Sequence, residues 1–275
     1  MSSAKWTNAP GARLTADRKS LEYACYGPPP GEAPTIVMLH EGLGCVTLWR
    51  DMPQKLADAT GFGVCVYSRA GYGASDPADM PRPLDYMTRE AEDSLGVVLD
   101  AIGFQHGILL GHSDGATIAT IYAGSISDQR VRGLILIAPH FFTEASGLAA
   151  IRTAGEAYAS GDLKARLAKY HSDPDIAFKG WHDAWTDPGF EAWNVADAID
   201  HLRIPVLAIQ GRDDAYGTLA QVTEIEERIY SPIETAILDD CGHAPQIDQP
   251  QATMAAITEF CERLERLERE EVKIA

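Results

Sequence analysis

Short apolar runs alternate with amphipathic stretches along most of the chain. The apolar runs predict strands at 35–39, 64–67, 108–110, 131–138, 205–209 and 234–238, after a strand pair within 11–27. Helical spacing follows in the segments 48–60, 86–102, 116–122 and 250–268. Short buried strands that alternate with helices are typical of βαβ units. The sequence therefore predicts an α/β fold with a mostly parallel eight-stranded sheet flanked by helices.

One segment breaks this alternation. Residues 141–202 have helical spacing, and they are too many for a simple crossover between consecutive strands. We expect a helical cap at 141–202, inserted after the sixth strand and lying over the C-terminal edge of the sheet. The core domain is then formed by residues 1–140 and 203–275.

A short motif between a strand and a helix carries the first candidate chemistry. Gly111-His112-Ser113-Asp114-Gly115 follows the apolar run at 108–110 and opens the helical pattern. In this context Gly-x-Ser-x-Gly indicates a nucleophile elbow, in which the serine projects from a tight, strained turn at a helix N-terminus. Flanking glycines allow the two backbones to approach closely. The alternative is that Ser113 is an ordinary helix N-cap.

Two later loops supply the partners that a nucleophilic serine needs. A serine hydroxyl requires a neighbouring base, and the base requires an orienting acid. In a parallel sheet we expect both at the C-terminal ends of later strands. Asp213 and Asp214 follow the strand at 205–209, and His243 follows the strand at 234–238.

These motifs resemble the α/β-hydrolase family over nearly the whole chain. The resemblance rests on residues 40–44, 68–75, 111–115, 211–214 and 242–245. It implies the α/β-hydrolase fold and a catalytic triad of Ser113, Asp214 and His243. The acid of the family is usually the last residue of Gly-x-x-Asp, so the resemblance favours Asp214 over Asp213.

Backbone N–H groups beside the serine are candidates for an oxyanion hole, which needs two preorganised donors. One is the N–H of Asp114, the residue after the serine. The resemblance implies that the second is the N–H of Gly42. Here Glu41 replaces a more common glycine, so Leu43 is kept as a reserve donor.

The sequence allows more than one role for each of two carboxylates near the serine. Asp114 is either stabilised by the helix dipole or contacts a polar or cationic group of the substrate. Because an inward carboxylate would oppose the charge of an oxyanion, we expect its side chain to turn aside. Glu41 either lines the pocket, or it is a solvated carboxylate or one that holds its loop in place.

The candidate substrate-binding residues are Glu41, Leu43, His140, Trp181 and Trp185. Trp181 and Trp185 fall in the expected cap, where they either pack it onto the core or form an aromatic wall for the substrate. His140 follows a strand, and it either rims the pocket or supports the structure.

Composition and charge narrow the classes of partner. The 275 residues, 45% of them hydrophobic, are enough for one large α/β domain with an insertion. A net charge of −17 disfavours nucleic acids and anionic membranes. No apolar run approaches the roughly 20 residues of a membrane helix. We therefore expect a small-molecule substrate and leave the oligomeric state open, with a homo-oligomer allowed.

The remaining motifs point to a cytoplasmic protein without a cofactor. We expect no secretory signal, because the first ten residues lack a basic segment followed by an apolar one. The five scattered cysteines fit free thiols in a reducing compartment. No Gly-x-Gly-x-x-Gly opens a helix after the first parallel strand, and no metal-ligand spacing such as His-Glu-x-x-His is present. We expect neither a nucleotide cofactor nor a metal.

The predicted activity is hydrolysis of a small or medium carboxylic ester through an acyl-enzyme on Ser113, with thioesters and lactones as related substrates. A serine nucleophile disfavours the dehalogenases and epoxide hydrolases of this fold, which need a carboxylate. One alternative is a carbon–carbon bond hydrolase of a ring-cleavage product, which would need cations such as Arg69, Arg152 or Arg212 in its pocket. Others are a non-catalytic small-ligand receptor, and cofactor-independent oxygen or perhydrolysis chemistry.

Overall fold

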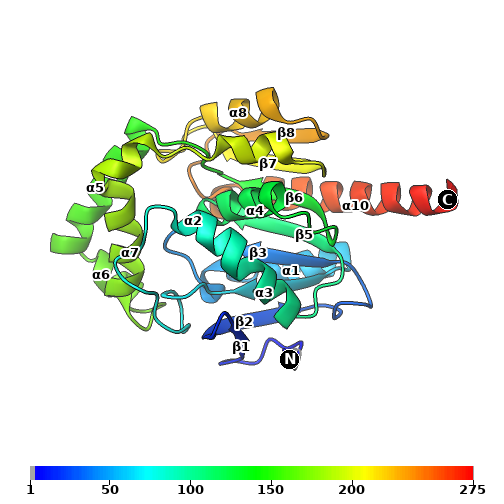
Figure 1. Ribbon diagram of the computed structural model, residues 1–275, viewed down its shortest axis with the longest axis horizontal. Coiled ribbons are helices and arrows are strands. Elements are labelled where there is room, and N and C mark those ends of the chain that lie inside the picture. The colour runs from blue at the N-terminus through cyan, green and yellow to red at the C-terminus, as the bar shows by residue number, and fades with distance from the viewer. Residues whose placement is uncertain (1–3, 275) are drawn as a thin grey trace.

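An eight-stranded sheet forms the centre of the protein in the computed structural model, which describes residues 4–274 (Figure 1). Its strands lie in the order β1-β2-β4-β3-β5-β6-β7-β8. β2 pairs antiparallel with β1 and β4, whereas β3 to β8 pair in parallel. The predicted α/β fold with a mostly parallel sheet is confirmed. The strands are β1 Arg13–Ala16, β2 Lys19–Tyr26, β3 Thr35–Leu39, β4 Gly63–Tyr67, β5 Gly107–His112, β6 Val131–Ile137, β7 Val206–Gly211 and β8 Ile233–Leu238.

Both faces of the central strands are buried, which explains why they read as continuous apolar runs. On β3, Val37 and Leu39 pack into one core layer, whereas Ile36 and Met38 pack into the other. Successive side chains of a strand point to opposite faces, so each strand contributes to both layers.

Helices cover the two faces of the sheet. Side chains of η2, α3, α4 and α8 belong to one core layer, and those of α1 and α10 belong to the other. The helices of the core are η1 Val46–Trp49, α1 Met52–Thr60, α2 Tyr86–Arg89, η2 Glu90–Leu95, α3 Gly96–Ala101, α4 Asp114–Ser125, α8 Ala220–Arg228, α9 Pro245–Asp248 and α10 Pro250–Ile274.

Three helical predictions differ in detail from the structure. The helix expected at 48–60 is divided into the 3-10 helix η1 and helix α1, because Arg50 between them has a positive φ of 55°. The helix expected at 86–102 is continuous through α2, η2 and α3, but η2 is a π-helical stretch with a wider turn. The closing helix α10 continues past residue 268.

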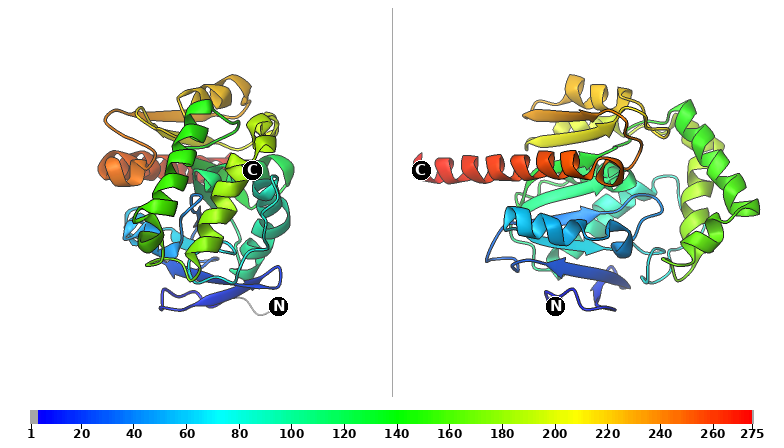
Figure 2. Two further views of the ribbon diagram at one scale, coloured as in Figure 1. Left: turned by 90° about the vertical axis from the view of Figure 1, so that its left-hand side faces the viewer. Right: turned by 180° about the vertical axis from the view of Figure 1, so that it is seen from behind.

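The segment between β6 and β7 is helical, as its spacing predicts. It contains α5 Ala145–Ser160, α6 Leu163–Leu167, α7 Pro174–Thr186, η3 Pro188–Ala192 and η4 Ala196–His201. Its two ends are joined, since the N–H of Val195 donates to the carbonyl oxygen of Phe141 (2.7 Å). Helices α5, α6 and α7 lie together beyond one end of the sheet (Figure 2). We refer to residues 141–202 as the inserted segment.

Helix α10 runs along the core and extends past the sheet at the opposite end from α5 and α7 (Figures 1 and 2). Leu264 is buried against the core, whereas Leu267 is half exposed. Among the helices of residues 4–274, none has the length and apolar character needed to span a bilayer.

Candidate active site

Ser113 lies at a sharp turn between β5 and α4. Its backbone has φ 53° and ψ −118°, a left-handed conformation that is strained for a residue with a side chain. A Cβ atom on Gly111 would collide with the backbone of Gly115, and one on Gly115 would collide with the carbonyl group of Leu39. The two glycines therefore permit the close approach that the motif predicts.

The hydroxyl group of Ser113 does not cap helix α4. Its Oγ instead lies 2.9 Å from Nε2 of His243, and the Nδ1 of that imidazole lies 2.7 Å from Oδ2 of Asp214. The three side chains, from positions far apart in the sequence, thus form one hydrogen-bonded chain. The His243 side chain is 20% exposed and the Asp214 side chain 1% exposed, so the carboxylate is shielded from water.

The surroundings of Asp214 keep it ionised. Its Oδ2 also accepts from the side-chain amide of Gln210 (2.8 Å), and its Oδ1 accepts from the N–H of Tyr216 (2.8 Å). Burial opposes ionisation, but the hydrogen bonds from His243 and Tyr216 outweigh it and hold the pKa of Asp214 below its ordinary value. A buried carboxylate of this kind can orient an imidazole and stabilise its protonated form.

The loop after β3 lies beside the Ser113 turn, because β3 and β5 are neighbouring parallel strands. Among residues 4–274, no acceptor is paired with the N–H of Gly42, Leu43 or Asp114. A Cβ atom on Gly42 would collide with the indole of Trp181, so this backbone passes directly against helix α7. His171 of the inserted segment contacts the carbonyl oxygen of Leu43 (3.1 Å) and so also holds this loop.

Glu41 and His112 connect this loop to the His243 loop. The carboxylate of Glu41 lies 3.4 Å from Nδ1 of His112, and Nε2–H of His112 donates to the carbonyl oxygen of His243 (2.7 Å). Burial lowers the pKa of His112, but its interactions with Glu41 outweigh burial and raise it overall. The pKa of Glu41 is lowered, because the His112 contact outweighs burial. Glu41 thus holds its loop in place, one of the roles expected from the sequence, and it also lines the pocket.

This ion pair leads to a pH-dependent stability prediction. Glu41→Gln is expected to lower the free energy of unfolding by about 1–3 kcal/mol at about pH 6. The raised pKa of His112 gives stability that is present at low pH and lost as the pH rises through its folded value, whereas the lowered pKa of Glu41 gives stability that is lost on acidification. The effect should therefore be smaller at about pH 9 than at about pH 6, because raising the pH removes the protonated form of His112 that pairs with Glu41.

Urea unfolding at the two pH values measures this difference. Glu32→Gln is the matched control, because Glu32 is exposed and belongs to a different loop. An equal loss for Glu41→Gln at both pH values would show that the pair does not stabilise the fold through its charges.

A pocket of about 120 Å³ opens at Ser113. The structure brings every candidate substrate-binding residue to its wall. The inserted segment supplies Trp181, Trp185 and the unanticipated Ile151, so the tryptophans face the pocket as well as packing in the core. The lining residues are Glu41, Gly42, Leu43, Ser113, Asp114, His140, Ile151, Trp181, Trp185, Tyr216 and His243.

His140 is an uncharged part of this wall. Burial lowers its pKa to about 3, so it is neutral around pH 7. Its ring lies 5.4 Å from the ring of His243 and 5.5 Å from that of Trp185. His140 therefore both rims the pocket and packs against its neighbours.

The three arginines considered as pocket cations are all elsewhere. Arg69 is buried and donates to the carbonyl oxygens of His40 (2.5 Å) and Glu41 (3.1 Å). Arg152 pairs with Glu191, and Arg212 pairs with Asp239 at the surface. No lysine or arginine lines the Ser113 pocket within the described chain.

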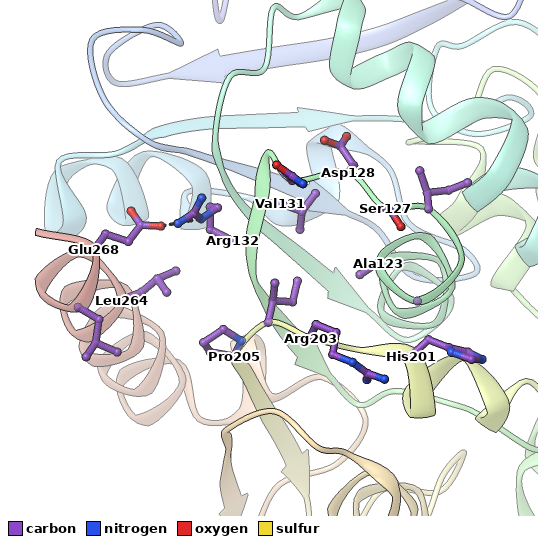
Figure 3. A pocket seen from close by; sticks show the side chains of 15 residues that line it. Ala123, Ser127, Asp128, Val131, Arg132, His201, Arg203, Pro205, Leu264 and Glu268 are labelled. Atoms are coloured by element: carbon purple, nitrogen blue, oxygen red, sulfur yellow. Dashed lines mark ion pairs between the residues drawn. The ribbon is translucent and has the colours of Figure 1, made fainter. Parts of the chain in front are cut away.

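A larger hollow of about 500 Å³ has a different lining. Figure 3 shows side chains that line it. It is formed by the C-terminal end of α4, the starts of β6 and β7, and α10. Arg132 and Glu268 form an ion pair across it (3.0 Å; Figure 3). It contains neither Ser113 nor His243, so the smaller pocket is the candidate active site.

Known proteins share this architecture. A family model described as alpha/beta hydrolase fold matches residues 34–168. Epoxide hydrolase 3 of Xenopus tropicalis is 20% identical over 82% of this chain and 71% of its own length. The human (lyso)-N-acylphosphatidylethanolamine lipase is 24% identical over 84% of this chain and 80% of its own length.

The enol-lactonase of Burkholderia xenovorans LB400 has the same fold, with a TM-score of 0.69 at 20% identity over 90% of this chain and 98% of that one. Together with the sheet order, these matches show that the chain has the α/β-hydrolase fold.

Proposed function

We propose that this protein is a serine hydrolase that cleaves small carboxylic esters. The observation that carries the proposal is the hydrogen-bonded chain from Ser113 through His243 to Asp214, at the mouth of a pocket. A hydroxyl, an imidazole and a carboxylate in this order form the catalytic unit of acyl-transfer enzymes.

In the first half of the reaction, Ser113 Oγ attacks the ester carbonyl carbon while Nε2 of His243 takes the hydroxyl proton. Asp214 stabilises the imidazolium that forms. The N–H groups of Asp114 and Gly42, which have no acceptor among the described residues, bind the negative oxygen of the tetrahedral intermediate. The bond to the alkoxy group then breaks, and His243 gives its proton to the leaving alcohol.

In the second half, water replaces the alcohol. His243 takes a proton from the water, and the hydroxide attacks the acyl-enzyme carbonyl. The bond to Ser113 Oγ breaks, the serine recovers its proton from His243, and the carboxylic acid is released. The reaction consumes one ester and one water without a cofactor.

The walls of the pocket support a small, uncharged acyl group. Its volume of about 120 Å³ lies below the roughly 300–1,000 Å³ of drug-sized ligand sites. Aromatic and aliphatic side chains dominate the wall. No lysine or arginine of the described residues lines it, which disfavours the anionic dienoates of a carbon–carbon bond hydrolase.

A panel of p-nitrophenyl esters tests the proposal. We expect kcat/KM for the acetate and the butanoate to exceed that for the decanoate by at least about 10-fold, because a ten-carbon chain does not fit the pocket. A fluorophosphonate probe should label the wild-type protein.

The same panel separates the alternatives. Folded protein that neither hydrolyses any ester nor reacts with the fluorophosphonate would be a ligand receptor on this fold. Faster hydrolysis of the decanoate than of the acetate would contradict the assignment of a small acyl group.

A further inference from the structure

Asp114 is a buried carboxylate on the wall of the Ser113 pocket. The residue is 1% exposed, and it is the first residue of helix α4. Its Oδ2 accepts a hydrogen bond from the hydroxyl of Tyr86 (2.5 Å), and that hydroxyl accepts one from Nε1–H of Trp185 (2.9 Å). Among residues 4–274, its Oδ1 has no hydrogen-bond partner.

An unpaired buried carboxylate oxygen is costly, because its lost hydration is not replaced. Tyr86 and Trp185 fix the other oxygen and therefore the orientation of the whole group. The carboxylate belongs to the residue whose N–H faces the expected oxyanion. A substrate group that satisfies Oδ1 must therefore lie close to the scissile carbonyl.

Two arginines decide the charge that this site accepts. The Arg82 guanidinium lies over the ring of Tyr86 (5.5 Å), and Arg69 and Arg82 both lie over the ring of Tyr72 (5.2 and 4.7 Å). Burial raises the pKa of Asp114 overall, although Arg69, Tyr86 and Arg82 act in the opposite direction. Because Arg69 and Arg82 already offset the negative charge of Asp114, a third cation would add little attraction. A neutral hydrogen-bond donor is enough to satisfy Oδ1.

We propose that Asp114 recognises a hydroxyl group on the acyl part of the substrate, on the carbon next to the carbonyl or on the one beyond. The substrate class is then a short-chain hydroxy-acyl ester. The inference rests on the proposed ester hydrolysis and specifies its substrate. The hydroxyl donates to Oδ1, and the apolar wall formed by Trp181, Trp185 and Ile151 encloses the remaining carbons.

The wild-type protein tests this directly with matched methyl esters. Methyl 2-hydroxypropanoate and methyl 3-hydroxybutanoate are compared with methyl 2-fluoropropanoate, which withdraws electrons without a donor, and with methyl butanoate. We expect kcat/KM for at least one hydroxy ester, divided by its rate of alkaline hydrolysis, to be about 10- to 100-fold higher than for either control. Alanine methyl ester, measured at a pH where its amine is protonated, should show no such gain.

Two variants link the preference to the carboxylate. Asp114→Asn keeps the backbone N–H but removes the charge, and it should reduce the hydroxy-to-fluoro ratio of kcat/KM towards one. Tyr86→Phe removes the hydrogen bond that orients the carboxylate, and it should reduce the same ratio partially. Because the ratio compares two substrates on one protein, a general loss of activity or folding does not imitate the effect.

The possible outcomes separate this inference from the proposed function. Hydrolysis of p-nitrophenyl acetate without a preference for either hydroxy ester overturns the inference alone, and an internal water would then be left to satisfy Oδ1. A preference for the ammonium ester over the hydroxy esters also overturns it, in favour of cation recognition. Failure to hydrolyse any ester overturns the proposed function and this inference with it.

Discussion

Ser113→Ala is expected to lower kcat/KM for p-nitrophenyl acetate by about five to six orders of magnitude. The variant lacks the oxygen that attacks the carbonyl, so no acyl-enzyme forms. Whatever activity remains comes from substrate binding and from the N–H groups that face the oxyanion. Steady-state kinetics on purified protein, together with loss of fluorophosphonate labelling, measures the effect.

The fold should tolerate this change. The Ser113 hydroxyl is paired with the imidazole of His243 rather than with the helix, and the strained turn depends on Gly111 and Gly115. Ser125→Ala is the matched control, because Ser125 is exposed at the far end of the same helix. If Ser113→Ala retained more than about one per cent of wild-type activity with unchanged labelling, the nucleophile would have to be another residue.

The sheet could be predicted from the sequence because its central strands are buried on both faces. Each apolar run of β3, β5, β6 and β7 is short and bounded by loop residues, which leaves little ambiguity about its type. The break at Arg50 could not be predicted, since a positive φ at an arginine depends on the packing around it. The π-helical turn in η2 likewise has no counterpart in the apolar spacing of the segment.

The candidate site, too, has residues that the sequence predicts and contacts that it does not. Ser113, Asp214 and His243 were predicted because each lies in a short loop motif directly after a strand, and parallel strands bring such loops to one edge of the sheet. The contacts around Asp114 were not predicted, because they join it to Tyr86 across 28 positions and join Tyr86 to Trp185 across 99. No local pattern encodes such pairs.

The expectation that the Asp114 side chain turns aside holds for one of its two carboxylate oxygens. One oxygen does turn to Tyr86, but the other remains unpaired and the residue still lines the pocket. The link from Glu41 through His112 to His243 was also missed. Its sequence signal is the replacement of a common glycine by Glu41, which marks a loop held by side-chain contacts as well as by its backbone.

Asp214→Asn is expected to lower kcat/KM by about 10⁴-fold. Both carboxylate oxygens accept hydrogen bonds from fixed donors: Oδ2 from Gln210 and His243, and Oδ1 from the N–H of Tyr216. An amide NH₂ at either position would face a donor. Asparagine therefore cannot hold the His243 tautomer in which Nε2 is free to accept the Ser113 proton.

Asp213→Asn separates this role from a general effect on the loop. Asp213 is the adjacent carboxylate and is exposed, whereas the Asp214 side chain is buried against His243, so Asp213→Asn should retain wild-type kinetics. The unpaired donor left by Asp214→Asn also costs stability, on the order of 1–3 kcal/mol, so urea unfolding must accompany the kinetics. A folded Asp214→Asn protein with near wild-type kcat/KM would mean that His243 needs no buried acid, and a larger loss in Asp213→Asn would transfer that role to its neighbour.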